Sequence, residues 1–158
     1  MSEERPLAIE VSGLEKTYEL GELTIHALNG VALSVASGEF VAVMGPSGSG
    51  KSTLLHLIGL LDVPDAGTVR IGGRDTAGLT DDELTALRRD ELGFIFQNFE
   101  LIPNLSAREN ILLPAEVAGR LAAARADLPA LARELGIEER LGHRPRQLSG
   151  GQRQRVAL

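Results

Sequence analysis

One segment of the chain, GPSGSGKST beginning at Gly45, has the residue types and spacing of a phosphate-binding loop. Gly45, Gly48 and Gly50 allow backbone conformations that other residues rarely adopt, so that N–H groups can turn toward an anion. Lys51 is placed to reach the β- and γ-phosphates, and the Ser52 hydroxyl suits a Mg²⁺ ion whose other ligands are mainly water and phosphate oxygens. The segment therefore predicts a nucleoside triphosphate site. Its expected binding residues are Gly45, Pro46, Ser47, Gly48, Ser49, Gly50, Lys51, Ser52 and Thr53.

The residues on either side supply the elements that such a loop requires. The run at 40–44 is apolar on both faces, which predicts an interior strand of a mostly parallel sheet. Residues 52–61 have the length and leucine content of a helix, whose start adds partial positive charge beside the loop. Strand, loop and helix together are the context in which the motif is meaningful. An accidental match is a poor alternative, because only two of the 158 residues are lysine.

A second segment, LSGGQ at 148–152, precedes RQRVAL and predicts the start of a helix with a serine cap. Alone, such a segment is an ordinary turn at a helix start. Beside a phosphate loop, its small residues and exposed N–H groups form a second anion site, open to a γ-phosphate brought by another molecule.

With both motifs in place, the sequence closely resembles the ATPase subunit of ATP-binding cassette (ABC) transporters, from about Leu7 to Leu158. LSGGQ followed by QRV is the family's own hallmark. The phrases LLDVPDAGTV, LGFIFQNFELIPNLSARENILLP and PRQLSGGQRQRVAL resemble the bacterial branch that serves lipoprotein release and macrolide or peptide export. The resemblance implies an α/β P-loop NTPase fold, the ABC ATPase domain, with a mostly parallel core sheet, an antiparallel β-subdomain and a helical insertion.

The resemblance also assigns roles to residues outside the loop. It implies that Tyr18 stacks on adenine, where a lone tyrosine is otherwise half-buried packing. It implies that Gln97 contacts the metal and the attacking water, where the alternative is a solvent-facing amide at a strand end. The metal ligands are then Ser52 and Gln97, the catalytic residues are Lys51 and Gln97, and the cofactors are ATP and Mg²⁺.

In the family, two ATPase subunits pair head to tail, so that Lys51 and Ser52 of one copy and the signature of the other enclose each ATP. The signature residues of this chain are Ser149, Gly150, Gly151 and Gln152. ATP binding then closes the pair and hydrolysis reopens it, which drives a transmembrane permease subunit. The resemblance thus implies an ATP-binding subunit that, when full length, hydrolyses ATP to export or release a substrate. A nucleotide-binding or regulatory module without catalysis stays an alternative, as does a soluble ATPase of DNA repair or translation.

The chain is expected to form one incomplete ABC ATPase domain. Residues 1–97 would form the nucleotide-binding core with its β-subdomain, 98–147 the helical insertion, and 148–158 the start of the signature helix. Further strands are expected at 7–11, 31–35 and 68–71, and helices at 81–89, 107–118 and 121–135. Proline inside the last two helices predicts a kink or an early end. The apolar residues expected either to contact the transmembrane subunit or to fold back as core are Phe99, Leu101, Ile102, Pro103 and Leu105.

The resemblance further implies an N-terminal fragment, because the family's catalytic aspartate–glutamate strand and switch histidine follow the signature. Asp62 also ends an apolar run, but Val63 follows it, and 11 helical residues beyond Lys51 place it roughly 16 Å from the phosphates. We therefore expect Asp62 to be a helix-end residue. His26, His56 and His143 are expected to be packing or surface residues.

Composition excludes several classes of protein. A net charge of −6 and a pI near 5.1 give no basic footprint for nucleic acid. No apolar stretch approaches 18 residues, and the first residues lack a signal-peptide pattern. The expected location is therefore the cytoplasm, peripheral on the cytoplasmic face of the cell membrane through a partner. Without cysteine, disulfides and thiolate metal sites are excluded.

Overall fold

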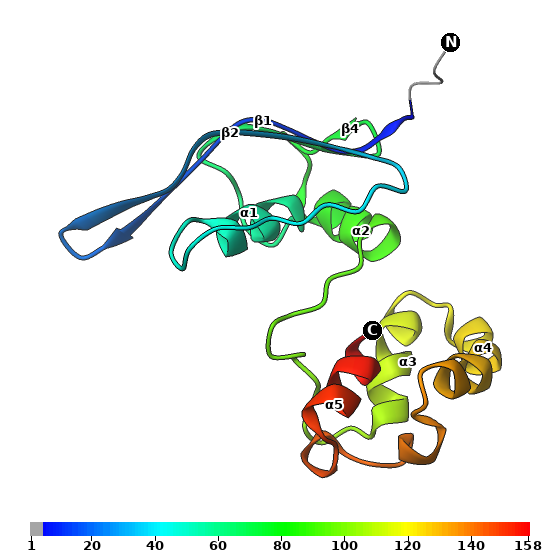
Figure 1. Cartoon of the computed structure of the whole chain (residues 1–158). Coiled ribbons are helices and arrows are strands. Elements are labelled where there is room, and N and C mark those ends of the chain that lie inside the picture. Colours follow the sequence, from blue (N-terminus) through cyan, green and yellow to red (C-terminus); the bar gives the residue numbers. More distant parts are fainter. Residues whose placement is uncertain (1–4) are drawn as a thin grey trace. The chain divides into compact units, whose positions relative to one another are not determined.

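The computed structural model of the chain describes residues 5–158, which divide into two compact units, one ending at Gly93 and the other spanning Phe94–Leu158 (Figure 1). The elements of the first unit are β1 (Leu7–Leu20), β2 (Leu23–Ala36), α1 (Lys51–Ile58), β3 (Ala66–Ile71), β4 (Arg74–Asp75) and α2 (Asp81–Glu91). The elements of the second are α3 (Ala107–Val117), α4 (Leu121–Glu134), the 3₁₀ turns η1 (Glu138–Arg140) and η2 (Pro145–Gln147), and α5 (Gly150–Ala157).

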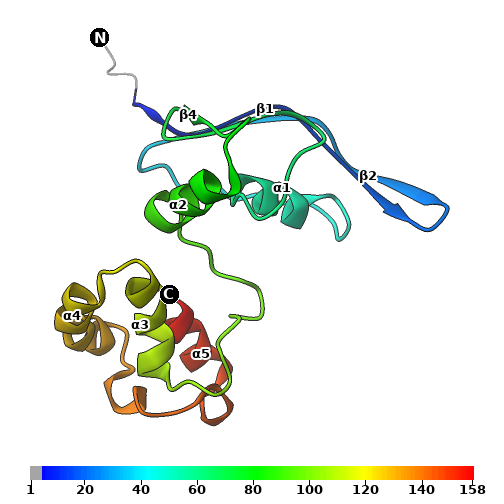
Figure 2. The same cartoon turned by 180° about the vertical axis from the view of Figure 1, so that it is seen from behind.

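The first unit is a four-stranded antiparallel sheet in the order β2-β1-β3-β4, with α1 and α2 on the same side of it (Figures 1 and 2). Its core lies between sheet and helices, where Val11 and Leu14 of β1 are buried together with Leu54 and Leu57 of α1. This packing fixes α1, and the loop before it, against the β1–β2 hairpin. The strands predicted at 7–11, 31–35 and 68–71 are all present.

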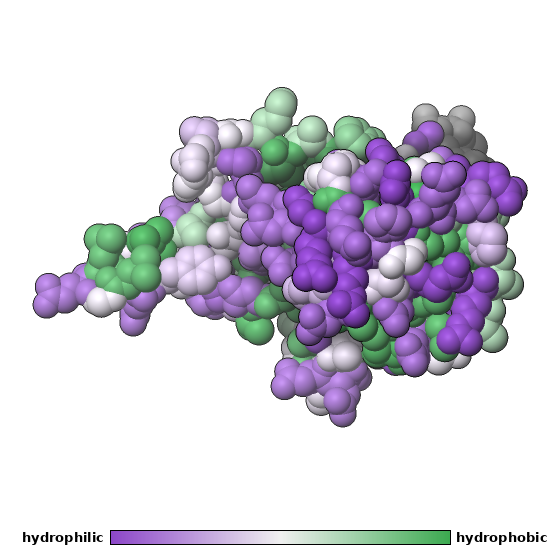
Figure 3. Space-filling view, turned by 90° about the horizontal axis from the view of Figure 1, so that it is seen from below, coloured by the Kyte–Doolittle hydropathy of each residue, from purple (hydrophilic) through white to green (hydrophobic). Residues whose placement is uncertain are grey.

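The far end of the β1–β2 hairpin carries apolar side chains on its surface (Figure 3). Leu20 and Leu23, which pair across the two-residue turn, are both exposed there. The hairpin is therefore packed against the rest of its unit only along the half nearer α1.

Residues 40–44 form no strand, so the prediction of an interior strand is wrong for the described structure. Phe40 and Met44 are 94% and 87% exposed. A strand needs a neighbouring strand for its backbone hydrogen bonds, and no segment among residues 5–158 pairs with this run. The described sheet is antiparallel throughout, so the parallel core sheet is not seen within these residues.

The second unit packs α3, α4 and α5 around its own core. Ala107 and Ala132 are fully buried, and such small side chains let helices approach closely. The segment before α3 is held by Asn110, whose side-chain amide donates to the Leu105 and Ser106 carbonyl oxygens at 3.2 and 2.9 Å. Leu101 of that segment packs against the core, as the fold-back alternative expects.

The helices predicted at 81–89, 107–118 and 121–135 are present as α2, α3 and α4. Thr80 and Ser106 cap α2 and α3 through the capping boxes that the sequence predicts. Helices α3 and α4 both continue past their internal prolines, so Pro114 and Pro129 end neither helix. Across residues 5–158, no helix combines the length and apolar character that crossing a bilayer requires.

Candidate nucleotide-binding site

The glycine-rich loop is shaped by close contact with the hairpin. Gly50 has a φ of +84°, and a Cβ built there would lie 2.3 Å from the Ala27 carbonyl oxygen of β2. Gly48 also has a positive φ, +80°, but open space surrounds it. Only glycine can occupy position 50 without moving the backbone, because any side chain would collide with the strand. The loop is thus positioned by tertiary packing as well as by its own conformation.

Helix α1 begins at Lys51, directly after the loop, and no side chain caps its start. The first N–H groups of a helix have no partner within the helix, and together with the helix dipole they favour an anion. A cavity of about 320 Å³ lies at this point. Its lining residues are Tyr18, Ile25, Ala27, Ser47, Gly48, Ser49, Gly50, Lys51, Ser52 and Thr53. The structure therefore brings Tyr18 and most of the predicted loop residues into one cavity.

The Lys51 ammonium group lies over the loop. Its Nζ donates to the Pro46 carbonyl oxygen at 2.6 Å and to Ser49 Oγ at 3.3 Å. Both contacts are exposed, so a phosphate oxygen at the cavity can reach the same cation. Lys51 therefore supplies a positive charge at the cavity without being part of a buried ion pair.

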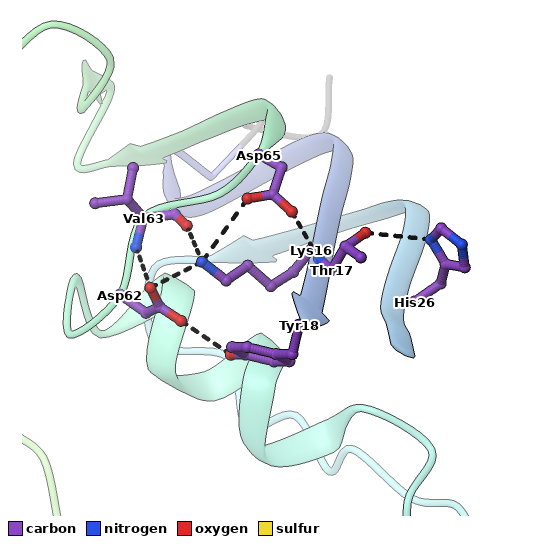
Figure 4. A network of polar contacts seen from close by, with 7 residues as sticks. All are labelled: Lys16, Thr17, Tyr18, His26, Asp62, Val63 and Asp65. Carbon is purple, nitrogen blue, oxygen red and sulfur yellow. Dashed lines mark hydrogen bonds and ion pairs between the residues drawn. The ribbon is translucent and has the colours of Figure 1, made fainter. Parts of the chain in front are cut away.

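Tyr18 lies on β1, opposite Ile25 of β2, where its ring borders the cavity. Its hydroxyl donates to Asp62 Oδ2 at 2.9 Å, and Lys16 Nζ lies 5.3 Å from the ring centroid (Figure 4). Partial burial, together with the bond to Asp62, raises the pKa of the Tyr18 hydroxyl. The phenol is therefore a neutral hydrogen-bond donor at physiological pH.

The signature segment opens α5, and the predicted serine cap is present. Ser149 Oγ accepts from the Gln152 N–H at 3.3 Å, and Gln152 Oε1 accepts from the Ser149 N–H at 2.9 Å. Gly150 and Gly151 are exposed. A Cβ added to Gly150 would meet nothing within 4 Å, and one added to Gly151 would meet only an Arg155 guanidinium nitrogen, at 3.8 Å.

Gln97 belongs to the second unit and lies in a turn, not at the end of a strand. It is exposed beside a cavity of about 260 Å³ whose lining also includes Phe99, Leu101, Pro145 and Arg153. Phe99 has a φ of +65°, a left-handed conformation that is rare for an aromatic residue and gives the turn a defined shape.

The sequence missed the residues that hold Tyr18. Asp62 lies just beyond α1, as expected of a helix-end residue, but its carboxylate binds both Tyr18 and Lys16. Asp65 binds the backbone next to Tyr18. Nothing in the local pattern pairs these two carboxylates with a strand more than 40 residues earlier, so only the spatial packing shows the contact.

The ligands expected for a metal are neutral oxygens. Among residues 5–158, no three His, Cys, Asp or Glu side chains form a group able to hold a metal ion. Ser52 and Gln97 supply one hydroxyl and one amide oxygen, which suit Mg²⁺ when phosphate oxygens and water complete its shell. Each of these two oxygens, the first in one unit and the second in the other, is by its chemistry a suitable ligand for a metal that arrives with a nucleotide.

A family model described as ABC transporter matches residues 28–158, and the chain belongs to this family. The predicted ABC transporter ATPase domain is thus confirmed.

Its curated relatives include macrolide export ATP-binding/permease proteins MacB. The protein from Marinobacter nauticus is 52% identical over 155 residues, covering 98% of this chain and 24% of the relative. The protein from Chlorobaculum tepidum is 46% identical over 150 residues, covering 95% and 23%. The chain therefore spans about a quarter of the length of these relatives.

Among solved structures, the chain is similar to the ATP-binding cassette MJ0796. A dimeric post-hydrolysis state bound to ADP and Pi aligns with a TM-score of 0.83 and 46% identity, covering 94% of this chain and 66% of that one. A second dimeric structure of MJ0796, described as a bacterial ABC transporter cassette, aligns with a TM-score of 0.85 and 47% identity over the same shares. This likeness confirms the predicted fold class.

Proposed function

We propose that the chain binds ATP with Mg²⁺ as the ATP-binding part of an ABC exporter, and that the complete protein hydrolyses the ATP. One observation carries the proposal: the uncapped start of α1, the glycine loop and the Tyr18 ring all line a single cavity. That arrangement offers N–H donors and a cation for the triphosphate, and an aromatic face for the base.

The residues of the loop have distinct roles in this proposal. Lys51 exchanges the Pro46 carbonyl oxygen for phosphate oxygens, while the N–H groups at the start of α1 bind the same phosphates. Ser52 contributes its hydroxyl to the metal, together with Gln97. Mg²⁺ bound there would neutralise the charge of the phosphates. Adenine stacks on Tyr18.

The signature is proposed to act on a nucleotide held by a second copy. Gly150 and Gly151 occupy the first positions of α5, where alanine would stabilise the helix and would find room. Open glycines at a helix start suit the close approach of another molecule's phosphate. A head-to-tail dimer would place Ser149 and Gly151 of one copy over Lys51 and Ser52 of the other. The MJ0796 structures are dimeric, which supports the pairing of two copies.

The MacB relatives are described as ATP-binding/permease proteins, which supports a transmembrane component for this protein too. We propose that the cavity beside Gln97, with Phe99 and Leu101, receives that component at the cytoplasmic face of the membrane. Because Gln97 is also a proposed metal ligand, the contact would link nucleotide state to transport. The cargo belongs to the permease and is left open.

Lys51→Ala tests the nucleotide site. MgATP affinity, measured by isothermal titration calorimetry on the protein expressed from its complete gene, should fall by about 30-fold or more, because hydrogen bonds to charged groups contribute about 1.5–3 kcal/mol each. Arg89→Ala is the matched control, since it removes an exposed cation on α2 that is paired with Asp90. Unchanged MgATP affinity in Lys51→Ala would refute the assignment.

A further inference from the structure

A network of polar contacts joins strand β1 to the segment that follows α1 (Figure 4). We call it the tyrosine clamp. Its members are Lys16, Thr17 and Tyr18 on the strand and Asp62 and Asp65 beyond the helix. Three of these five side chains are charged, and all act close to the one aromatic ring that lines the nucleotide cavity.

The Asp62 carboxylate is held at both of its oxygens. Oδ2 accepts from the Tyr18 hydroxyl at 2.9 Å. Oδ1 accepts from Lys16 Nζ at 2.9 Å and from the Val63 N–H at 2.8 Å. Lys16 Nζ also donates to the Val63 carbonyl oxygen at 2.6 Å. With donors on both oxygens, the carboxylate has one orientation, and the tyrosine hydroxyl is tied to it.

Asp65 binds the backbone of β1 just before Tyr18, and its carboxylate also lies 3.9 Å from Lys16 Nζ. Its Oδ2 accepts from the Thr17 N–H at 2.6 Å, and its own N–H donates to the Glu15 carbonyl oxygen at 3.0 Å. The β1–β2 register shifts between Lys16 and Thr17, which marks a local irregularity in the strand. The strand is therefore held next to Tyr18 through the backbone of Thr17, and the Tyr18 ring is held at its hydroxyl.

Charge and burial together maintain the hydrogen bonds of the tyrosine clamp near neutral pH. The Lys16 side chain is only 11% exposed, and Asp62 is 33% exposed. The hydrogen bond with Asp62 raises the pKa of Lys16, while partial burial opposes this. For Asp62, partial burial works against ionisation, but the donors Lys16 and Tyr18 outweigh it and lower the pKa. Both groups are therefore charged over a wide range of pH.

We propose that Asp62 is a positioning residue for the base of the nucleotide: it orients the Tyr18 ring through its hydroxyl, and Lys16 holds Asp62 in place. The inference rests on the proposed ATP site. Helix α1 would then link the two parts of the ligand: its first residue, Lys51, faces the triphosphate, and Asp62, four residues beyond the end of the helix, holds the ring for the base. A strand tyrosine without this bond can rotate about its side-chain torsions, and fixing such a side chain on binding costs roughly twofold to tenfold in affinity.

The test compares two ligands, MgATP and Mg-tripolyphosphate, by calorimetry on the protein expressed from its complete gene. Asp62→Ala should weaken MgATP binding by roughly threefold to tenfold and leave tripolyphosphate binding unchanged, because only ATP carries a base. Tyr18→Phe keeps the ring, loses the hydroxyl and should show a loss of the same size. The double variant should lose no more than Tyr18→Phe alone, since that change already removes the hydroxyl that both Asp62 and Thr53 contact. Asp75→Ala on β4 is the matched control, because Asp75 also accepts from a backbone N–H and pairs with a cation, Arg70, but does not line the nucleotide cavity.

Three results would overturn the proposal: equal losses for both ligands, additive losses in the double variant, or wild-type affinity in both single variants. If Asp62→Ala does not fold, Tyr18→Phe alone decides, because it removes only one oxygen from an exposed ring. Failure of the wild type to bind MgATP would refute the proposed function and this inference with it. If the wild type binds MgATP normally but the variants keep its ratio of ATP affinity to tripolyphosphate affinity, this inference alone would be refuted.

Discussion

The chain has two glycine-rich segments at helix starts, and they use glycine for opposite reasons. At Gly50 the protein itself requires it, because φ is +84° and a Cβ would collide with the Ala27 carbonyl oxygen. At Gly150 and Gly151 the described residues require nothing of the kind, since the added Cβ atoms would find space. In the first segment, glycine is required by contacts within the chain itself. The second is a surface left open for another molecule.

The caps of the two helices differ in the same sense. Helix α1 has no side-chain cap, so its first N–H groups are available to a ligand held by the same copy. Helix α5 is capped by Ser149 and Gln152, which satisfy each other's backbone N–H groups. What α5 can still offer are the N–H groups of its two glycines and the hydroxyl hydrogen of Ser149.

The largest expected effect is the loss of stability when the first glycine-rich segment is altered. Gly50→Ala should lower the free energy of unfolding by about 3 kcal/mol or more, because it adds both a collision and an unfavourable φ. Gly48→Ala, with a similar φ but no collision, should cost only about 1–2 kcal/mol. Denaturant unfolding measures both, and equal costs would show that the contact with Ala27 is not limiting.

Gly151→Ala should weaken the association of two copies without lowering the stability of one copy, in contrast to Gly50→Ala. The free energy of unfolding should stay the same or rise by up to about 1 kcal/mol, since alanine is the better helix residue. ATP-driven association of two copies should weaken by about tenfold or more, because the methyl group occupies the path of the approaching phosphate. Thermal melting and analytical ultracentrifugation separate the two effects. A destabilised monomer would contradict the view of this segment as an open surface.

A smaller effect separates capping from ligand contact in the second segment. Ser149→Ala and Ser106→Ala each remove a capping box of nearly the same geometry, with serine oxygens 3.3 Å from the third backbone N–H. Each should cost about 1 kcal/mol of stability. Only Ser149→Ala should also weaken ATP-driven dimerisation in ultracentrifugation. Equal dimerisation in both variants would show that Ser149 only caps the helix and does not contact the nucleotide.

The smallest expected effect concerns pH and the clamp beside the first segment. The lowered pKa of Asp62 means that its stabilising contribution is present above the unfolded value of about 3.9 and is lost as the pH falls through the folded value. The raised pKa of Lys16 means that its contribution is present below about 10.4 and is lost as the pH rises through the folded value. The difference in melting temperature between wild type and Asp62→Ala should therefore be constant from about pH 5 to 9 and shrink toward pH 3. A difference that grows in acid would contradict the ion pair.

Part of the fold and site could be predicted from sequence because it depends on neighbours along the chain. The caps at Thr80, Ser106 and Ser149 use side chains three residues away, so their pattern is visible in the sequence. The loop and the helix that follows it are local in the same way. The prediction of a strand at 40–44 was wrong because a strand forms only beside a neighbouring strand, which no local pattern supplies. The sequence pattern predicted that Asp62 lies at a helix end, but it did not predict the contact with Tyr18.

By itself, the sequence determined that a phosphate loop precedes α1 and that a capped, glycine-bearing turn opens α5, since both follow from residue type and short spacing. Only the tertiary structure decided that Gly50 fits against Ala27 and that Asp62 reaches Tyr18 and Lys16. These contacts join segments more than 20 residues apart, and they depend on how the hairpin packs along α1. Burial of the shared apolar core fixes that packing, and the polar contacts of the site follow from it.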